Sequence, residues 1–125
     1  MPSIRVYGSR IAADRQADIA AAMTDIMRST LHVPIIEVFF PVIDGPYTNG
    51  KYGGDDYVTL IIEGPDYVPE TGNQLCRDLT EAFRKCSGRE NCKVSMVYHV
   101  NDHDHVGDGG VLLNFRKQGG RPSGT

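Results

Sequence analysis

One pattern occurs twice in this chain of 125 residues: a strand-like segment, an amphipathic helix-like segment and a second strand-like segment. Strands are indicated by alternating or short continuous apolar runs, and helices by apolar residues that recur every three or four positions. A strand–helix–strand connection is almost always right-handed, with its two strands parallel. The order therefore predicts an α+β fold of tandem β-α-β units with a four-stranded mixed sheet. The predicted strands span residues 3–7, 35–43, 57–62 and 92–100, and the predicted helices span about 14–30 and 70–86.

Each predicted helix has one apolar face. Asp14 is a candidate N-cap for the first helix, and Gly88 is a candidate C-terminal stop for the second. With one apolar face each, the two helices are expected to cover one face of the sheet. The apolar positions are Ile19, Met23, Ile26 and either Met27 or Thr30 in the first helix, and Leu75, Leu79, Phe83 and Cys86 in the second.

The segment 35–43 (IIEVFFPVI) is nearly apolar throughout. A strand that is apolar on both sides is buried on both sides. Because two helices cover only one face of a four-stranded sheet, we expect another copy of the chain to cover the second face.

The middle and the end of the chain are predicted to be loops. The middle is dense in Gly, Pro, Asn and Asp, and Asn49–Gly50 is a candidate type I′ turn. Residues 111–115 are predicted to form a short extra strand, which could reach a neighbouring subunit. The last residues have no apolar content to order them. We therefore predict a single domain, residues 1–115, and a flexible C-terminal tail, residues 116–125.

The composition excludes several classes of function. The formal net charge is −3 and the pI is near 5.7, and the only basic run is RKQGGR, which argues against a nucleic-acid partner. No apolar run approaches the roughly 20 residues of a membrane span, and the N-terminus lacks the features of a signal peptide. We expect a cytoplasmic protein with no membrane partner. Its cysteines, Cys76, Cys86 and Cys92, form no CxxC motif and are expected to be free thiols.

The first ten residues, MPSIRVYGSR, carry the main candidate for chemistry. Methionine aminopeptidase removes Met1 before a small residue such as Pro2, and the mature chain would then begin with a free secondary amine. The ordinary pKa of an α-amino group is about 7.7 to 8, and burial beside a cation such as Arg10 lowers that pKa. Such an amine can act as a general base near neutral pH. The alternative is that Pro2 is an ordinary second residue.

Several segments, which together span most of residues 2–115, follow one another in an order that is typical of a known protein family. They are Pro2, SIRVYG, Arg10, ADIAAAMTDIM, HVPIIEVFF and KVSMVYHVNDHDHVGDGG before LLNF. Together they resemble the tautomerase superfamily, which includes 4-oxalocrotonate tautomerase, macrophage migration inhibitory factor and malonate semialdehyde decarboxylase. The resemblance implies a homotrimer whose three sheets pack together around a central barrel, with active sites near the subunit interfaces. It also implies that Pro2 is the catalytic base, that no cofactor or metal takes part, and that the substrate is a small enol or keto acid.

The same resemblance implies roles for individual residues. Arg10 lies one residue before the position of an arginine that binds the substrate carboxylate in 4-oxalocrotonate tautomerase. His32 stands where the migration inhibitory factor branch has a lysine at the pocket. Phe39 replaces a second catalytic arginine, which removes a carbonyl-polarising group and makes the pocket more apolar. We therefore predict that Pro2 and Arg10 are catalytic and that His32 and Phe39 bind substrate.

Other positions depart from the branches of the family. The turn at residues 64–68 lacks the arginines that the decarboxylase and dehalogenase branches carry after the third strand. Ser95 and Val97 stand where the migration inhibitory factor branch has Tyr and Asn. These departures leave the substrate and the branch open.

Two further side chains are candidates for substrate binding. Alternation along the fourth strand puts His99 on the same face as Ser95 and Val97, the face that the family directs at the site. A histidine there could donate to a substrate oxygen, because its pKa lies close to neutral. The alternative is a surface histidine at a strand end. Tyr52, like Tyr47 on the glycine-rich loop, is a candidate for the mouth of the pocket.

The segment HVNDHDH contains metal-type ligands. His99, Asp102, His103 and His105 could bind a divalent metal through imidazole and carboxylate groups. No cysteine or helix-borne ligand supports such a site. We therefore predict a solvated polar loop and no metal.

The leading hypothesis is a cofactor-independent keto-enol tautomerase, an isomerase with Pro2 as the general base and Arg10 as the carboxylate clamp. His32 or His99 would polarise the substrate carbonyl. One alternative is another Pro2-dependent reaction of the hydratase, decarboxylase or dehalogenase type. The other is a non-catalytic ligand-binding protein with the same fold.

Overall fold

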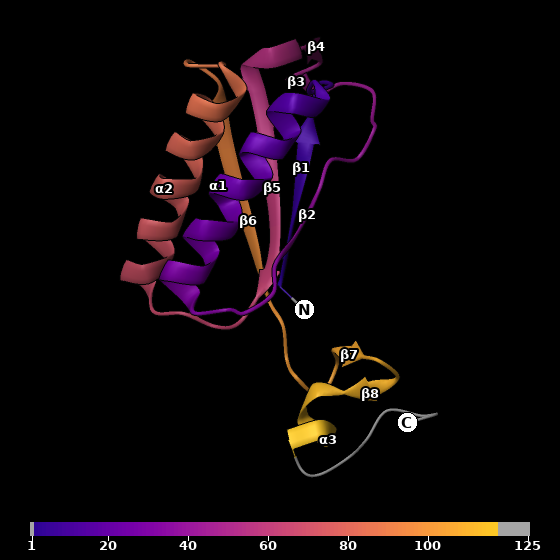
Figure 1. Ribbon diagram of the computed structural model, residues 1–125. Helices are drawn as coiled ribbons and strands as arrows, with labels where there is room; N and C mark the ends of the chain where they lie inside the picture. Colours follow the sequence, from indigo (N-terminus) through magenta and orange to yellow (C-terminus); the bar gives the residue numbers. More distant parts are fainter. Residues whose placement is uncertain (1, 118–125) are drawn as a thin grey trace.

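The fold is a four-stranded mixed sheet with two long helices, in a computed structural model that describes residues 2–117 (Figure 1). The strand order in the sheet is β2-β1-β5-β6. This architecture confirms the predicted α+β class. The strands are β1 (Ser3–Gly8), β2 (Glu37–Phe39), β5 (Tyr57–Gly64) and β6 (Lys93–Val100), and the helices are α1 (Ala13–Leu31) and α2 (Pro69–Ser87).

The sheet consists of two parallel strand pairs that are joined edge to edge through their inner strands, β1 and β5. β1 pairs with β2 in parallel, with Ile4 opposite Val38, and β5 pairs with β6 in parallel, with Ile62 opposite Tyr98. β1 and β5 meet antiparallel in the middle of the sheet. The tandem β-α-β prediction is confirmed, since each helix connects a parallel pair.

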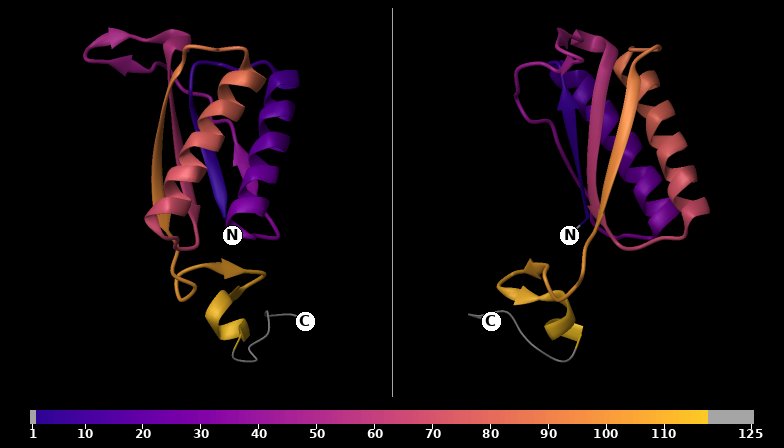
Figure 2. Two further views of the ribbon diagram at one scale, coloured as in Figure 1. Left: turned by 90° about the vertical axis from the view of Figure 1, so that its left-hand side faces the viewer. Right: turned by 180° about the vertical axis from the view of Figure 1, so that it is seen from behind.

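Both helices lie on one face of the sheet, as the two views in Figure 2 show. Alternation along β1 and β5 directs their even-numbered side chains at the helices, and these are buried while the odd-numbered ones are partly exposed. The predicted helix faces are confirmed, with Met27 rather than Thr30 in the core of α1. The largest fully buried side chains are Phe83, Ile4, Ile19, Met23, Met27, Leu60, Ile62, Leu75, Leu79 and Val58.

The helix ends differ in part from the prediction. Asp14 is not the N-cap of α1: the capping residue is Ala12, which makes no side-chain cap, and Asp14 lies in the first turn. A carboxylate there still interacts favourably with the positive end of the helix dipole. At the other end His32 terminates α1 in a left-handed conformation. Gly88 ends α2 in the same way, as predicted.

The second strand is shorter than the sequence indicates. β2 comprises only Glu37–Phe39, and the chain then leaves the sheet. Pro41 lacks the N–H that a continuing ladder would require. The expected burial on both sides is wrong for a single chain, because nothing within residues 2–117 forms a second layer over the outer face. Phe39 is 47% exposed and Val42 is 97% exposed.

The middle of the chain forms a small hairpin that projects from the body of the protein (Figure 2, left view). β3 (Tyr47–Thr48) pairs with β4 (Lys51–Tyr52), and a 3-10 turn, η1 (Gly54–Asp56), then leads into β5. Asn49 and Gly50 connect the two strands, and both have positive φ angles, 52° and 79°. Positive φ at both positions defines the type I′ turn predicted from the sequence.

The C-terminal segment forms a second hairpin and a short helix below the sheet (Figure 1). β7 (Gly107–Asp108) pairs with β8 (Val111–Leu112), and α3 (Leu113–Lys117) follows directly. The predicted strand at 111–115 is therefore correct only for its first two residues, and in this chain its partner is β7. The predicted tail from residue 116 overlaps the end of α3, and residues 118–125 lie outside the described residues.

The turn between β5 and α2 is held by a pair of tyrosines. The Tyr98 hydroxyl donates to the Pro65 carbonyl at 2.5 Å, and its ring packs on Tyr67 with the ring centroids 4.5 Å apart. Burial, with smaller contributions from Tyr67 and Asp66, raises the pKa of Tyr98 to about 12. The hydroxyl therefore stays protonated over the whole neutral range and remains a donor.

Between residues 2 and 117, no helix combines the length and the apolar composition that a membrane crossing requires.

We predict that Tyr98 makes the protein less stable as pH rises through 10 to 12. An unfolded tyrosine ionises near pH 10, whereas the folded one keeps its proton to about pH 12. The unfolded state therefore binds fewer protons in this window, and the free energy of unfolding falls. Urea unfolding at pH 9 and 11.5 should show a smaller fall for Tyr98→Phe than for wild type. Tyr52→Phe, at a position that is 62% exposed, is the control and should behave like wild type. Equal falls in all three proteins would contradict the prediction.

Candidate active site

A cavity of about 440 Å³ opens beside Pro2, at the end of the sheet where β1 begins and β5 ends. It lies where the end of α1, the β5–α2 turn and the C-terminal segment meet. Most of its walls are apolar, and no Lys or Arg is among its lining residues in the described part of the chain. The lining residues are Pro2, Leu31, His32, Val33, Pro34, Ile35, Pro65, His103, Asp108 and Leu113.

Pro2 is held by the start of a central strand. Its carbonyl accepts a hydrogen bond from the Glu37 amide at 3.2 Å, which extends the β1–β2 ladder by one residue. Gly64 lies beside it on β5, and a Cβ there would lie 2.5 Å from the Tyr98 hydroxyl oxygen and 3.9 Å from the Pro2 Cβ. The Tyr98 hydroxyl leaves no room for a side chain at Gly64, and the half-buried Pro2 lies within ordinary contact distance of the same position.

His32 lines the cavity from the end of α1. Its φ of 57° and ψ of 33° put it in the left-handed region, and its amide donates to the Arg28 carbonyl at 3.0 Å. Left-handed conformations suit glycine and disfavour most other residues. His32 is exposed and lines the cavity, so its left-handed conformation lowers the stability of the fold at a position beside Pro2.

His103 and Asp108 add two further ionisable groups to the same cavity. The His103 carbonyl accepts from the Asn114 amide at 3.1 Å, which ties the loop to α3. In the sequence, His103 belongs to a predicted polar loop, and no pattern distinguishes Asp108. No motif associates either residue with Pro2, and their position depends on the fold of β7, β8 and α3.

The remaining part of the histidine-rich segment is a turn. The Asp104 amide donates to the Asp102 carboxylate at 2.9 Å. This hydrogen bond, and to a smaller extent the nearby His105, keeps the pKa of Asp102 below its usual value. The His105 imidazole lies 3.4 Å from the same carboxylate. Within the described residues, no group of three or more His, Cys, Asp or Glu side chains is arranged to hold a metal ion.

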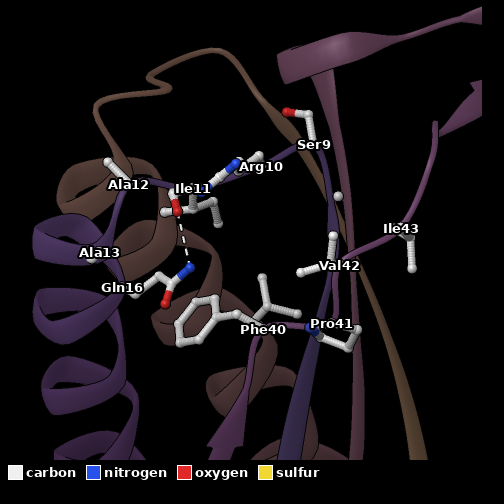
Figure 3. A pocket seen from close by; sticks show the side chains of 12 residues that line it. Ser9, Arg10, Ile11, Ala12, Ala13, Gln16, Phe40, Pro41, Val42 and Ile43 are labelled. Atoms are coloured by element: carbon white, nitrogen blue, oxygen red, sulfur yellow. Dashed lines mark hydrogen bonds between the residues drawn. The ribbon is translucent and has the colours of Figure 1, made fainter.

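β1 runs from the N-terminus at one end of the sheet to the opposite end (Figure 1), and Arg10 follows its last residue by two positions, whereas Pro2 directly precedes its first. A strand rises about 3.3 Å per residue, so the six residues of β1 separate the two ends by about 20 Å. Arg10 lines a different cavity of about 390 Å³, between the start of α1 and the segment after β2. Figure 3 shows the side chains of Phe40, Val42 and Ile43 on the other side of that cavity.

The other predicted residues are not at the Pro2 cavity within one chain. Phe39 is on the outer face of the sheet, opposite Arg5, which is hydrogen-bonded to Glu63. His99 is on the same outer face, opposite Glu63, near the level of Pro2. Tyr52 lies at the Arg10 end, where a cavity of about 430 Å³ includes Arg10, Tyr47 and Tyr52.

The candidate residues thus form two groups within one chain. Pro2 and His32 come together with two residues that sequence reasoning missed, whereas Arg10 and Tyr52 come together at the far end. A single ligand cannot contact both groups of the same chain.

Solved structures share this fold at low sequence identity. A structure of N1, a member of the cis-3-chloroacrylic acid dehalogenase family, matches with a TM-score of 0.76 and 16% identity, covering 93% of this chain and 88% of that one. Leishmania major MIF2 matches with a TM-score of 0.73 and 19% identity, covering 89% and 96%. A fused 4-OT described as an asymmetric trimer matches with a TM-score of 0.74 and 13% identity, covering 90% and 96%.

The chain therefore has the same fold as these structures, and this is the fold that the resemblance in its sequence implies. No protein-family model matches the sequence, and a search of curated proteins finds no match.

We predict that His32→Gly leaves the protein at least as stable as wild type. Glycine relieves roughly 1 kcal/mol of left-handed strain, and the added freedom of the unfolded chain offsets part of that gain. The expected change in the free energy of unfolding is therefore between zero and a gain of about 1 kcal/mol, measured by urea unfolding. Asn49→Gly, at the other described non-glycine residue with positive φ, should gain less, because asparagine tolerates this region. A clear loss of stability in His32→Gly would show that the side chain has a structural role.

Proposed function

We propose that this protein is a cofactor-independent tautomerase that uses the amine of Pro2 to interconvert the enol and keto forms of a small carboxylated substrate. The observation that carries the proposal is the half-buried Pro2 at the end of a central strand, facing a mostly apolar cavity with acid–base side chains. Such walls disfavour the protonated amine and favour a neutral base. The fold, which is common to tautomerase superfamily structures, supports the same reaction class.

In the proposed reaction the Pro2 nitrogen takes the proton from the enol hydroxyl and delivers it to the neighbouring carbon. The O–H bond breaks and a C–H bond forms, while the carbon–carbon double bond becomes single and the carbon–oxygen bond becomes double. Pro2 returns to its neutral state because it takes up one proton and gives up one. A hydrogen bond to the substrate oxygen stabilises the charge that develops there. His32 is better placed for this than His99, because His32 lines the cavity and His99 lies on the outer face.

We propose that Arg10 binds the substrate carboxylate from a neighbouring copy of the chain. About 20 Å of β1 separates Arg10 from its own Pro2, so Arg10 can act at a Pro2 cavity only in an assembly. A homotrimer is the assembly we favour, and the uncovered outer face, with Phe39 at 47% and Val97 at 45% exposure, supports it. Similar structures described as fused 4-OT trimers support it too.

The cavity favours a substrate with one carboxylate and an apolar body. Its described walls contain no cation that could pair with a second carboxylate, and Asp108 would repel one. We therefore propose an aryl or alkyl 2-oxo acid, or its enol, in preference to a dicarboxylate. The cytoplasmic location inferred from the sequence stays a prediction.

A second candidate is a Pro2-dependent reaction that adds water, as in hydration or hydrolytic dehalogenation. The observation that favours it is Asp108, a carboxylate in the Pro2 cavity that tautomerisation does not require. The similarity to a member of the cis-3-chloroacrylic acid dehalogenase family points the same way. A ligand-binding protein without catalysis is the remaining alternative, and the Pro2→Ala variant separates it from both enzymes.

We predict that Pro2→Ala lowers the rate of phenylenolpyruvate ketonisation by about 100-fold or more, the range of a lost general base. The measurement is the decay of ultraviolet absorbance with protein whose mass shows removal of Met1. A matched control is wild-type protein with an uncleaved N-terminal tag, in which the Pro2 nitrogen is an amide; it should be equally inactive and regain activity on cleavage. Equal rates for wild type and Pro2→Ala would sink the tautomerase proposal for this substrate.

We also predict that kcat/KM is higher for phenylenolpyruvate than for 2-hydroxymuconate. Repulsion between Asp108 and a second carboxylate is expected to cost about 1 kcal/mol, or roughly a fivefold difference. Asp108→Asn should reduce that difference by raising kcat/KM for the dicarboxylate, 2-hydroxymuconate. A ratio that favours 2-hydroxymuconate in wild type would overturn the proposed substrate class and leave the role of Pro2 intact.

A further inference from the structure

The segment between β1 and α1, residues 9–12, is held by a different element at each of three successive residues. The Ser9 hydroxyl donates to the Asp55 carboxylate of η1. The Arg10 carbonyl accepts from Arg89, in the turn between α2 and β6, at 3.0 Å. The Ile11 carbonyl accepts from Gln16 of α1 at 2.9 Å, the bond drawn in Figure 3. The backbone that carries Arg10 is therefore fixed on both sides and at Arg10 itself.

Arg89 is the residue that links these contacts. The guanidinium nitrogen that binds the Arg10 carbonyl lies 3.3 Å from the Asp55 carboxylate, so Asp55 connects Ser9 and Arg89. Its own backbone is held as well: the Arg89 amide donates to the Ser87 hydroxyl at 3.2 Å, and its carbonyl accepts from the Cys92 amide at 3.1 Å. The Arg89 side chain is only 13% exposed.

The burial of Arg89 is costly in one respect. Its second terminal nitrogen, Nη1, is buried and has no hydrogen-bond partner among the described residues. A buried donor without a partner lowers stability. The contact with the Arg10 carbonyl therefore comes with a cost in stability. This cost favours a functional role for Arg89 over a purely stabilising one.

Arg10 itself has the opposite character. Its side chain is exposed, and its guanidinium has no acceptor within the described part of the chain, so it is available to a ligand. The Arg10 side chain is long and flexible, so a fixed backbone position limits the space that its guanidinium can reach.

We propose that Arg89, together with Asp55, is a positioning residue that fixes the backbone from which Arg10 binds the substrate carboxylate. This inference rests on the proposed function, since it assigns Arg10 that role. Arg89 does not line the Arg10 cavity and is not expected to touch substrate. Its loss should weaken carboxylate binding and leave proton transfer at Pro2 unchanged.

The test uses Arg89→Met, with Arg15→Met as the matched control. Arg15 also donates from its guanidinium to a backbone carbonyl, that of Cys86 at 3.1 Å, in the same region, but it does not contact residues 9–11. We expect Arg89→Met to raise KM for phenylenolpyruvate by about tenfold with kcat within about threefold of wild type, the effect of a misplaced binding group. Arg89→Lys, which keeps a donor, should recover part of the loss, and Arg15→Met should leave KM unchanged.

A double variant separates positioning from general damage to the fold. If Arg89 acts through Arg10, then Arg89→Met should raise KM no further in an Arg10→Ala background. A further rise of the same size in that background, or an unchanged KM in Arg89→Met alone, would overturn the inference. If Arg10→Ala itself leaves KM unchanged, the proposed role of Arg10 fails, and the inference fails with it. A rise in KM for Arg10→Ala without one for Arg89→Met would reject the inference alone.

Discussion

The structure depends on the position of β1 in the interior of the sheet. This strand is paired in parallel with β2 on one side and antiparallel with β5 on the other, so both of its ends are fixed. One end carries Pro2 at an apolar cavity, and the other leads into the Arg10 segment. A rigid central strand holds a small ring nitrogen far more precisely than a free N-terminus would, because chain ends are poorly ordered unless a sheet or a helix binds them.

The uncovered face of the sheet connects the fold to the proposed chemistry. The helices bury the central strands on one face, whereas the outer face combines the Arg5–Glu63 ion pair with exposed Phe39 and Val97. Exposed apolar side chains on a sheet face are typical of an interaction surface, and the proposed assembly would cover this one with another subunit. An assembly through this face would also account for the distance between Arg10 and Pro2, since neighbouring copies can combine opposite ends of the sheet in one site.

Local patterns in the sequence predicted most of the fold but only part of the site. The helix faces, the Asn49–Gly50 turn and the parallel pairs follow from periodicity and chain order, which are local properties. The length of β2 does not, because it depends on where Pro41 ends the ladder. Pro2 was identifiable as a chemical group, whereas Asp108 reaches the cavity only through the tertiary position of the β7–β8 hairpin. Arg10 was grouped with Pro2 because the two are close in sequence, although an extended strand separates them.

The proposed chemistry requires the Pro2 nitrogen to be a neutral secondary amine at the cavity. The most direct test is a ¹⁵N NMR spectrum of protein labelled at proline, recorded at pH 7.5. We expect a signal from a largely unprotonated secondary amine at Pro2, which shifts when pH is lowered and when a 2-oxo acid binds. A signal typical of an amide, which would mean that Met1 is retained, or a fully protonated amine at this pH would rule out Pro2 as the general base.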